Sequence, residues 1–184
     1  MTEPIKHEDM VRALAKPGKD ILATMTPEGV HLLHMAVGIS GEVGELLEAA
    51  CALPENLDME NLVEEFGDLE FYIEGARQGL GISREEVMLT RFDINLHPAV
   101  GIPVQAANFL DAVKRLVIYN KPLDQAKAIE ALAGIEVFLR CMREDFGVTR
   151  EATLDANIAK LGKRYEGMRY SDQAAQARAD KAAA

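Results

Sequence analysis

The stretch TPEGVHLLHMAVGISGEVGELLEA, residues 26–49, decides the fold class because a clear helix start is followed by a long helical pattern. Thr26 is suited to cap the helix, and Pro27 suits its first position, where a missing N–H costs no hydrogen bond. Apolar side chains then recur at helical spacing until Pro54 ends the pattern. The stretch therefore predicts one long helix.

Similar signals mark helices elsewhere in the chain. Asp58 is placed to cap a second helix that terminates at Gly81, and the capping box that starts at Ser83 opens a short third helix. The sequence has no convincing alternating strand pattern, so the fold class is predicted as all-α. The other helices are expected at about Ile5–Ala15, Val104–Tyr119, Asp124–Gly147 and Thr149–Tyr165, with a linker at Asn95–Pro103.

Composition and charge narrow the classes of partner. The 184 residues suit one domain, and the formal net charge of -10 argues against a nucleic-acid partner, which needs a basic surface. No apolar run is long enough to span a membrane, and the polar N-terminus does not resemble a signal peptide, so a cytoplasmic location is expected. Cys51 and Cys141 lie in apolar helical contexts, which predicts two buried free thiols.

An internal repeat divides the chain into two halves. The segment that starts at Val63 aligns without a gap with the segment that starts at Ile129. Any two amphipathic helices that end in glycine share some similarity, but the match continues through the junction after the glycine, which favours a duplication. The residues that meet identical partners are Glu64, Glu70, Arg77, Gly81, Arg84 and Glu85, which recur as Glu130, Glu136, Arg143, Gly147, Arg150 and Glu151.

Two pairs of carboxylates have the spacing of a metal site. Glu42 and Glu45 stand three residues apart on the first long helix, and Glu65 and Asp68 repeat that spacing on the next. Converging carboxylates repel one another, and a hard divalent ion such as Mg²⁺ or Mn²⁺ removes that repulsion. Solvated charges on outer helix faces are the common alternative. A di-iron centre is disfavoured because neither pair is followed by the histidine that such sites use.

Three glycines recur along the helix that carries the first pair. Gly38, Gly41 and Gly44 each cost about 1 kcal/mol relative to alanine in a helix interior, so the space they leave is expected to be used. A close helix crossing and a nucleotide lying against the helix are the two interpretations, and both can hold.

Three segments together resemble a known family. LLHMAVGISGEVGELLEA, VEEFGDLEFYI and ANIAKLGKRY resemble, in order, the signature segments of MazG-like nucleoside triphosphate pyrophosphohydrolases, which have an all-α fold. The resemblance covers about residues 26–92 and 150–178. The family pattern is Glu-Glu-x-x-Glu on one helix and Glu-x-x-Asp on the next, and this chain departs from it by carrying Gly41 at the first acidic place.

The resemblance implies an activity and a set of site residues. It implies Mg²⁺-dependent hydrolysis of (deoxy)nucleoside triphosphates to the monophosphate and pyrophosphate, in control of the nucleotide pool. Either Glu45 or Glu48 would orient the attacking water, and His34 would belong to the nucleoside pocket. The metal ligands would be Glu42, Glu45, Glu65 and Asp68, and the phosphates would meet Asn157, Lys160, Lys163 and Arg164.

The resemblance and the repeat together predict the domain organisation. Members of the family form dimers, so the chain is expected to be one domain over residues 1–184 that folds as a pseudo-dimer. Its active half would span about 26–94 and its degenerate half about 104–165, followed by a polar tail over 167–184 that wraps loosely or frays. A homodimer is also expected, although a pseudo-dimeric chain could act alone.

The second copy has lost the candidate ligands. Ala131 replaces Glu65, and Gly134 replaces Asp68. A shifted alignment pairs Glu45 with Lys114. The cation of Lys114 or of Arg115 would then reach the phosphates. One metal site per chain is therefore expected.

Two other functions fit the same residues. One is a base-specific all-α pyrophosphatase directed at dUTP, dCTP or dGTP. The other belongs to a different class, a non-catalytic helical regulatory protein with a vestigial nucleotide site. The four carboxylates in the first half argue against the second alternative.

Overall fold

The computed structural model describes residues 5–181, which form helices and turns and contain no strand. Residues 1–4 and 182–184, which belong to the predicted domain range and tail, lie outside this part. Within residues 5–181, no helix combines the length and apolar character that a membrane span requires. The helices are α1 His7–Leu14, α2 Gly18–Leu22, α3 Pro27–Ala50, α4 Met59–Leu80, α5 Arg84–Leu89, α6 Pro98–Tyr119, α7 Gln125–Phe146, α8 Arg150–Arg164 and α9 Asp172–Ala177.

Local capping interactions set the helix boundaries in the first half. The Thr26 hydroxyl accepts a hydrogen bond from the Gly29 N–H at 3.1 Å, with Pro27 at the first helical position. Asp58 caps α4, and Gly81 ends it in the left-handed region at φ 68°. Ser83 forms the capping box that opens α5. These predicted helix ends are confirmed, because each depends on residues adjacent in sequence.

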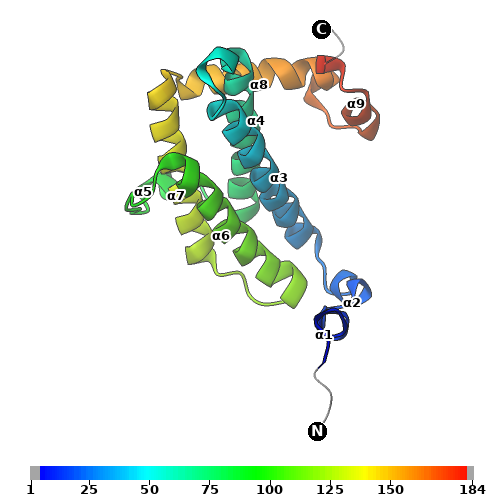
Figure 1. Ribbon diagram of the computed structural model, residues 1–184. Helices are drawn as coiled ribbons and strands as arrows, with labels where there is room; N and C mark the ends of the chain where they lie inside the picture. The colour runs from blue at the N-terminus through cyan, green and yellow to red at the C-terminus, as the bar shows by residue number, and fades with distance from the viewer. Residues whose placement is uncertain (1–4, 182–184) are drawn as a thin grey trace.

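Two long helical hairpins form the body of the molecule (Figure 1). Helix α3 packs along α4, α6 packs along α7, and the two hairpins meet where α3 packs on α6. One buried apolar cluster runs through all four helices and includes Leu46, Phe66, Phe109 and Ile135. The shorter helices cross between hairpins, since α5 packs on α7 and α8 packs on α4.

The predicted linker at Asn95–Pro103 is wrong in its second part. Helix α6 begins at Pro98 and continues through Pro103. His97 caps this helix, and its Nδ1 accepts a hydrogen bond from the Ala99 N–H at 3.3 Å. Pro98 occupies the first position, which tolerates proline, and Pro103 removes a single hydrogen bond near the helix start. Ile102, the residue before Pro103, is fully buried in the core, so this part of the helix is also held by apolar packing.

The C-terminal segment differs from the expected loose tail. Its described part forms α9 and a 3₁₀ turn at Ala179–Lys181, and both pack against α8. Asp180 anchors it, because both of its carboxylate oxygens accept hydrogen bonds from Arg164, each at 2.7 Å. In Figure 1 the segment extends from the bundle together with the end of α8.

The two cysteines are free, but their expected burial is wrong for Cys51. Helix α3 ends at Ala50, earlier than the predicted end at Pro54, and Cys51 is the exposed residue that follows. Cys141 is half-buried on α7.

Candidate metal centre

Three of the four predicted carboxylates converge. Glu42 and Glu45 on α3 and Glu65 on α4 each offer an oxygen, and these three atoms lie within 4.8 Å of one another. The pairing of α3 with α4 produces this arrangement, because Val43 and Phe66, next to the carboxylates in sequence, are buried between the helices. Glu65 is buried, Glu42 half-buried and Glu45 exposed.

Asp68 lies beside this cluster and is held by α8. Asn157 Nδ2 donates a hydrogen bond to Asp68 Oδ1 at 2.8 Å, and Lys160 Nζ donates to Oδ2 at 2.5 Å. Lys160 also forms an ion pair with Glu64 at 3.4 Å. Although Asp68 lies one turn after Glu65, it is not among the three carboxylates whose oxygens lie within 4.8 Å of one another.

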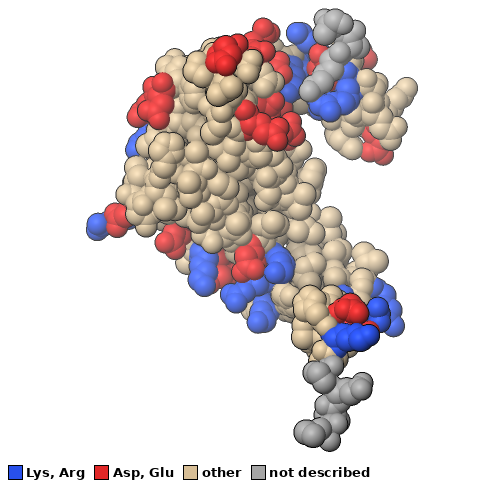
Figure 2. Space-filling view, in the orientation of Figure 1, with Lys and Arg blue, Asp and Glu red and all other residues tan. Residues whose placement is uncertain are grey.

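A cavity of about 380 Å³ joins the carboxylates to the cations of α8. Figure 2 shows acidic and basic side chains close together at the upper end of the molecule, where α8 and α9 meet the bundle. The cavity therefore presents hard oxygen ligands on one side and phosphate-binding groups on the other. Its charged lining residues are Glu42, Glu45, Glu65, Asp68, Lys160, Arg164 and Arg178.

Burial and the neighbouring carboxylates together perturb Glu42. The pKa of Glu42 is raised from 4.5 to about 7, chiefly by burial and then by the negative charges of Asp68, Glu45 and Glu65, while Lys160 opposes the rise. Burial, followed by the charge of Glu42, also raises the pKa of Tyr72. A divalent cation bound among these oxygens would favour the ionised form of Glu42. Three carboxylates within reach of one ion form a donor set that suits Mg²⁺ or Mn²⁺.

The structure separates the two candidates for orienting water. Glu45 lines the main cavity and also an adjoining depression, whereas Glu48 lines only the depression, together with Asp58 and Asn61. Glu45 is therefore the candidate that faces Asp68 and Lys160.

Three predicted substrate-binding residues have different surroundings. Arg164 lines the cavity, although its guanidinium is engaged by Asp180. Lys163 does not line the main cavity but a neighbouring one, and Lys160 lines both. His34 does not line the main cavity; its ring packs edge-to-face on Tyr72, with 5.9 Å between ring centroids.

Sequence reasoning missed Tyr72, Arg178 and Asp180. Tyr72 lines the cavity and lies one turn after Asp68, so helical spacing from Asp68 was a signal that could have found it. Arg178 lines the cavity from the segment after α9, and Asp180 binds Arg164. The sequence of the C-terminal segment indicates neither the position of Arg178 nor the pairing of Asp180, because both depend on how this segment folds back on α8.

The three glycines of α3 do not share one role. A Cβ added at Gly38 would lie 2.2 Å from the Tyr72 ring, whereas Gly41 and Gly44 have no such neighbour within 4 Å. The close crossing therefore accounts for Gly38 alone.

The predicted cations of α6 lie away from the acidic cavity. Lys114 pairs with Asp111 at 3.6 Å, and Arg115 pairs with the same carboxylate at 3.7 Å. Arg115 lines a different cavity, of about 310 Å³, between α6 and α7.

Comparisons of this chain with protein-family models, with curated proteins and with solved structures found no match.

Proposed function

We propose that the chain is a Mg²⁺-dependent pyrophosphohydrolase of (deoxy)nucleoside triphosphates, related to the MazG-like family. The observation that carries the proposal is the single cavity in which Glu42, Glu45 and Glu65 face Lys160 and Arg164. Carboxylates of this kind bind hard divalent ions, and these ions in turn bind the phosphates of a triphosphate. The side-chain cations of Lys160 and Arg164 suit a leaving pyrophosphate. Release of the monophosphate and pyrophosphate is the reaction that the sequence resemblance implies.

The roles of the individual residues follow from their exposure and contacts. Glu42, Glu45 and Glu65 would hold Mg²⁺, which when bound would neutralise phosphate charge and lower the pKa of a bound water. Glu45 is the most exposed of the three and is favoured over Glu48 to orient that water. Lys160 holds Asp68 in place and faces the cavity, and Asp68 would complete the ligand set of the ion. Arg164 would exchange Asp180 for a phosphate oxygen.

We further propose that the chain is an internally duplicated pseudo-dimer. Reciprocal ion pairs between the halves support this proposal. Glu70 of the first half binds Arg143 and Arg150 of the second. In the same way, Glu136 of the second half binds Arg77 and Arg84 of the first. Each of these second-half residues is the repeat equivalent of a first-half residue, at one constant interval in the sequence, as expected for two halves that pack like the subunits of a dimer.

The second half contains a counterpart of the acidic site. Its cavity is lined on α6 by Asn108, Asp111, Ala112 and Arg115. Their spacing is the same as that of four residues that line the first-half depression, Glu45, Glu48 and Ala49 on α3 and Ala52 just after it. Ala131 on α7 and Asp124, which caps that helix, complete it, as Glu65 on α4 and its cap Asp58 do in the first half. This correspondence pairs Glu45 with Asn108, and it replaces the sequence alignment of Glu45 with Lys114.

Loss of charge at these positions supports one metal site per chain. The uncharged amide of Asn108 takes the place of Glu45, and Gly134 takes the place of Asp68. The space beside Gly134 is filled by Phe92 and Gln105, since an added Cβ would lie 2.8 Å and 2.7 Å from their side chains. The degenerate half would act by supplying α8, with Asn157 and Lys160, to the active half.

A substrate panel tests the activity. The protein would be incubated with each (d)NTP and Mg²⁺, and pyrophosphate would be assayed. Glu42→Gln and Asp68→Asn should abolish turnover with helicity unchanged. Asp111→Asn, in the second-half cavity, is the matched control and should stay active. Orthophosphate as the only product would refute the reaction, and full activity of both site variants would refute the site.

The same panel addresses the narrower alternatives. Preference for dUTP, dCTP or dGTP would appear as one dominant substrate. Light scattering at assay concentration would distinguish a pseudo-dimeric monomer from the homodimer that the family resemblance also predicts.

A further inference from the structure

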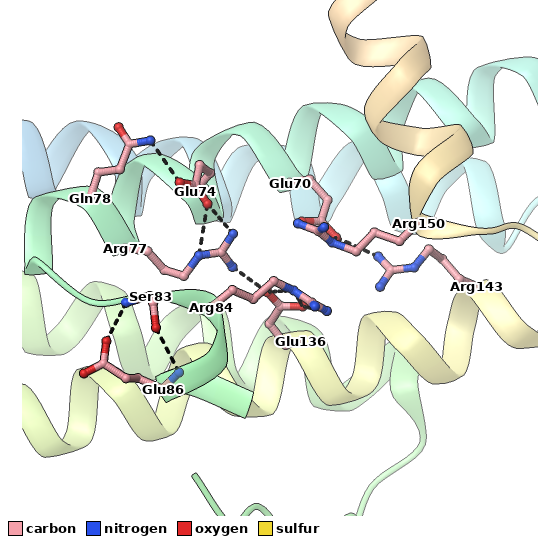
Figure 3. A network of polar contacts seen from close by, with 10 residues as sticks. All are labelled: Glu70, Glu74, Arg77, Gln78, Ser83, Arg84, Glu86, Glu136, Arg143 and Arg150. Atoms are coloured by element: carbon pink, nitrogen blue, oxygen red, sulfur yellow. Dashed lines mark hydrogen bonds and ion pairs between the residues drawn. The ribbon is translucent and has the colours of Figure 1, made fainter. Parts of the chain in front are cut away.

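Two buried carboxylates, one from each half, are each bound by two arginines of the other half (Figure 3). Glu70 and Glu136 are both only 1% exposed. Arg150 approaches Glu70 with two parallel hydrogen bonds, from Nε to Oε1 and from Nη2 to Oε2, each at 2.9 Å. Arg84 approaches Glu136 in the same way, at 3.1 Å for both bonds. The two pairs therefore have nearly the same chemistry.

The helices that these two arginines begin are very different. Arg84 is the first residue of α5, which ends after six residues at Leu89. Arg150 is the first residue of α8, which continues for 15 residues and carries Asn157 and Lys160 to the acidic cavity. The Arg84 pair therefore fixes a helix that contributes nothing to that cavity, whereas the Arg150 pair fixes one that does.

Glu70 also lies close to the centre that α8 completes. It follows Asp68 by two residues on α4, so Arg150 attaches the start of α8 to the same segment that carries Asp68. Two turns further along α8, Asn157 reaches Asp68 Oδ1, and Lys160 then reaches Oδ2. The position of Asn157 and Lys160 thus depends on where α8 begins.

Little apolar packing holds α8 in place. Its buried residues are Thr153, Asn157 and Lys160, and none of them is hydrophobic. The α8 backbone lies against Gly67, where an added Cβ would be 2.6 Å from the Thr153 carbonyl oxygen. Because polar contacts predominate, loss of a buried two-bond ion pair at one end would let the helix shift.

We propose that Arg150 and Glu70 are positioning residues for the candidate metal centre. Their ion pair places α8 so that Asn157 and Lys160 hold Asp68 and Lys160 faces the cavity. The Arg84–Glu136 pair is its structural counterpart and has no role in the centre. This inference rests on the proposed function for its kinetic test.

The internal counterpart supplies the control. Arg150→Ala and Arg84→Ala would be compared in the full chain, using the triphosphate that the panel identifies. Both variants should lower the unfolding temperature by similar amounts. Arg150→Ala should raise KM tenfold or more, whereas Arg84→Ala should leave KM within about twofold of wild type. Equal effects on KM, or none in either variant, would overturn the proposal.

A second measurement does not require turnover. Hydrogen exchange of the α8 amides from Thr153 to Lys163 should increase in Arg150→Ala and remain unchanged in Arg84→Ala. Unchanged exchange in both variants refutes the positioning role, even if the chain hydrolyses triphosphates. Absence of any triphosphate hydrolysis in wild type refutes the proposed function alone, since the exchange experiment still tests how α8 is placed.

A milder pair of substitutions covers the case in which Arg150→Ala does not fold. Arg150→Lys keeps the charge but cannot form two parallel bonds, so it should give a KM between those of wild type and Arg150→Ala. Arg84→Lys is the matched control and should not change KM. A KM that rises equally in both lysine variants would contradict the assignment.

Discussion

Substitution of Glu42 by glutamine removes the charge from a half-buried carboxylate of the cluster while keeping the shape of its side chain. The pKa of Glu42 rises from 4.5 to about 7 on folding, first because of burial and then because of the neighbouring carboxylates. Between these two values the folded state keeps a proton that the unfolded chain releases. The free energy of unfolding of wild type should therefore fall as pH rises through this window.

The size of the effect follows from the shift. A rise from 4.5 to about 7 corresponds to at most about 3 kcal/mol. Solvent screening at a half-buried side chain reduces this to roughly 1–2 kcal/mol. Glu42→Gln cannot ionise, so its stability should match that of wild type near pH 4 and exceed it by this amount above pH 7.

Urea unfolding followed by circular dichroism, with EDTA and at constant ionic strength, measures the difference. Glu48→Gln on the same helix is the matched control, because Glu48 is exposed and lies outside the cluster. Added Mg²⁺ should stabilise wild type and remove the advantage of Glu42→Gln. A difference between Glu42→Gln and wild type that is the same at pH 4 and pH 8 would refute the electrostatic reasoning.

Two further predictions concern packing and the C-terminal segment. Gly38→Ala should destabilise the fold by about 1–3 kcal/mol, because the added methyl group would overlap the Tyr72 ring. Gly41→Ala faces open space and should stabilise the fold by up to about 1 kcal/mol. Thermal unfolding measures both changes, and equal changes would contradict the packing of Gly38 on Tyr72. Asp180→Asn should release Arg164 and tighten pyrophosphate binding several-fold in calorimetry; unchanged affinity would show that Asp180 does not compete with phosphate.

Much of the helical architecture was predictable because the signals are local. Thr26, Asp58 and Ser83 bond to backbone groups within three residues, so their sequence context is sufficient. The start of α6 was missed because two prolines look like a break. Whether a helix tolerates proline depends on its position relative to the cap, and His97 is a less common capping residue than serine or aspartate.

The candidate site was predictable only in part, for a related reason. Spacing of three residues on adjacent helices was enough to bring Glu42, Glu45 and Glu65 together. Whether Asp68 faces the other carboxylates or α8 depends on the distant placement of that helix, which periodicity does not encode. The contact between Asp180 and Arg164 requires the chain to turn back on itself, and no residue pattern indicated that.

The products of triphosphate hydrolysis show directly whether the protein is a pyrophosphohydrolase. Phosphorus NMR of a reaction with Mg²⁺ and a hydrolysed (d)NTP distinguishes cleavage between the α- and β-phosphates from cleavage at the γ-phosphate. We expect nucleoside monophosphate and pyrophosphate, with no turnover in Asp68→Asn or in EDTA. Nucleoside diphosphate with orthophosphate, or no hydrolysis of any (d)NTP by wild type, would contradict this expectation.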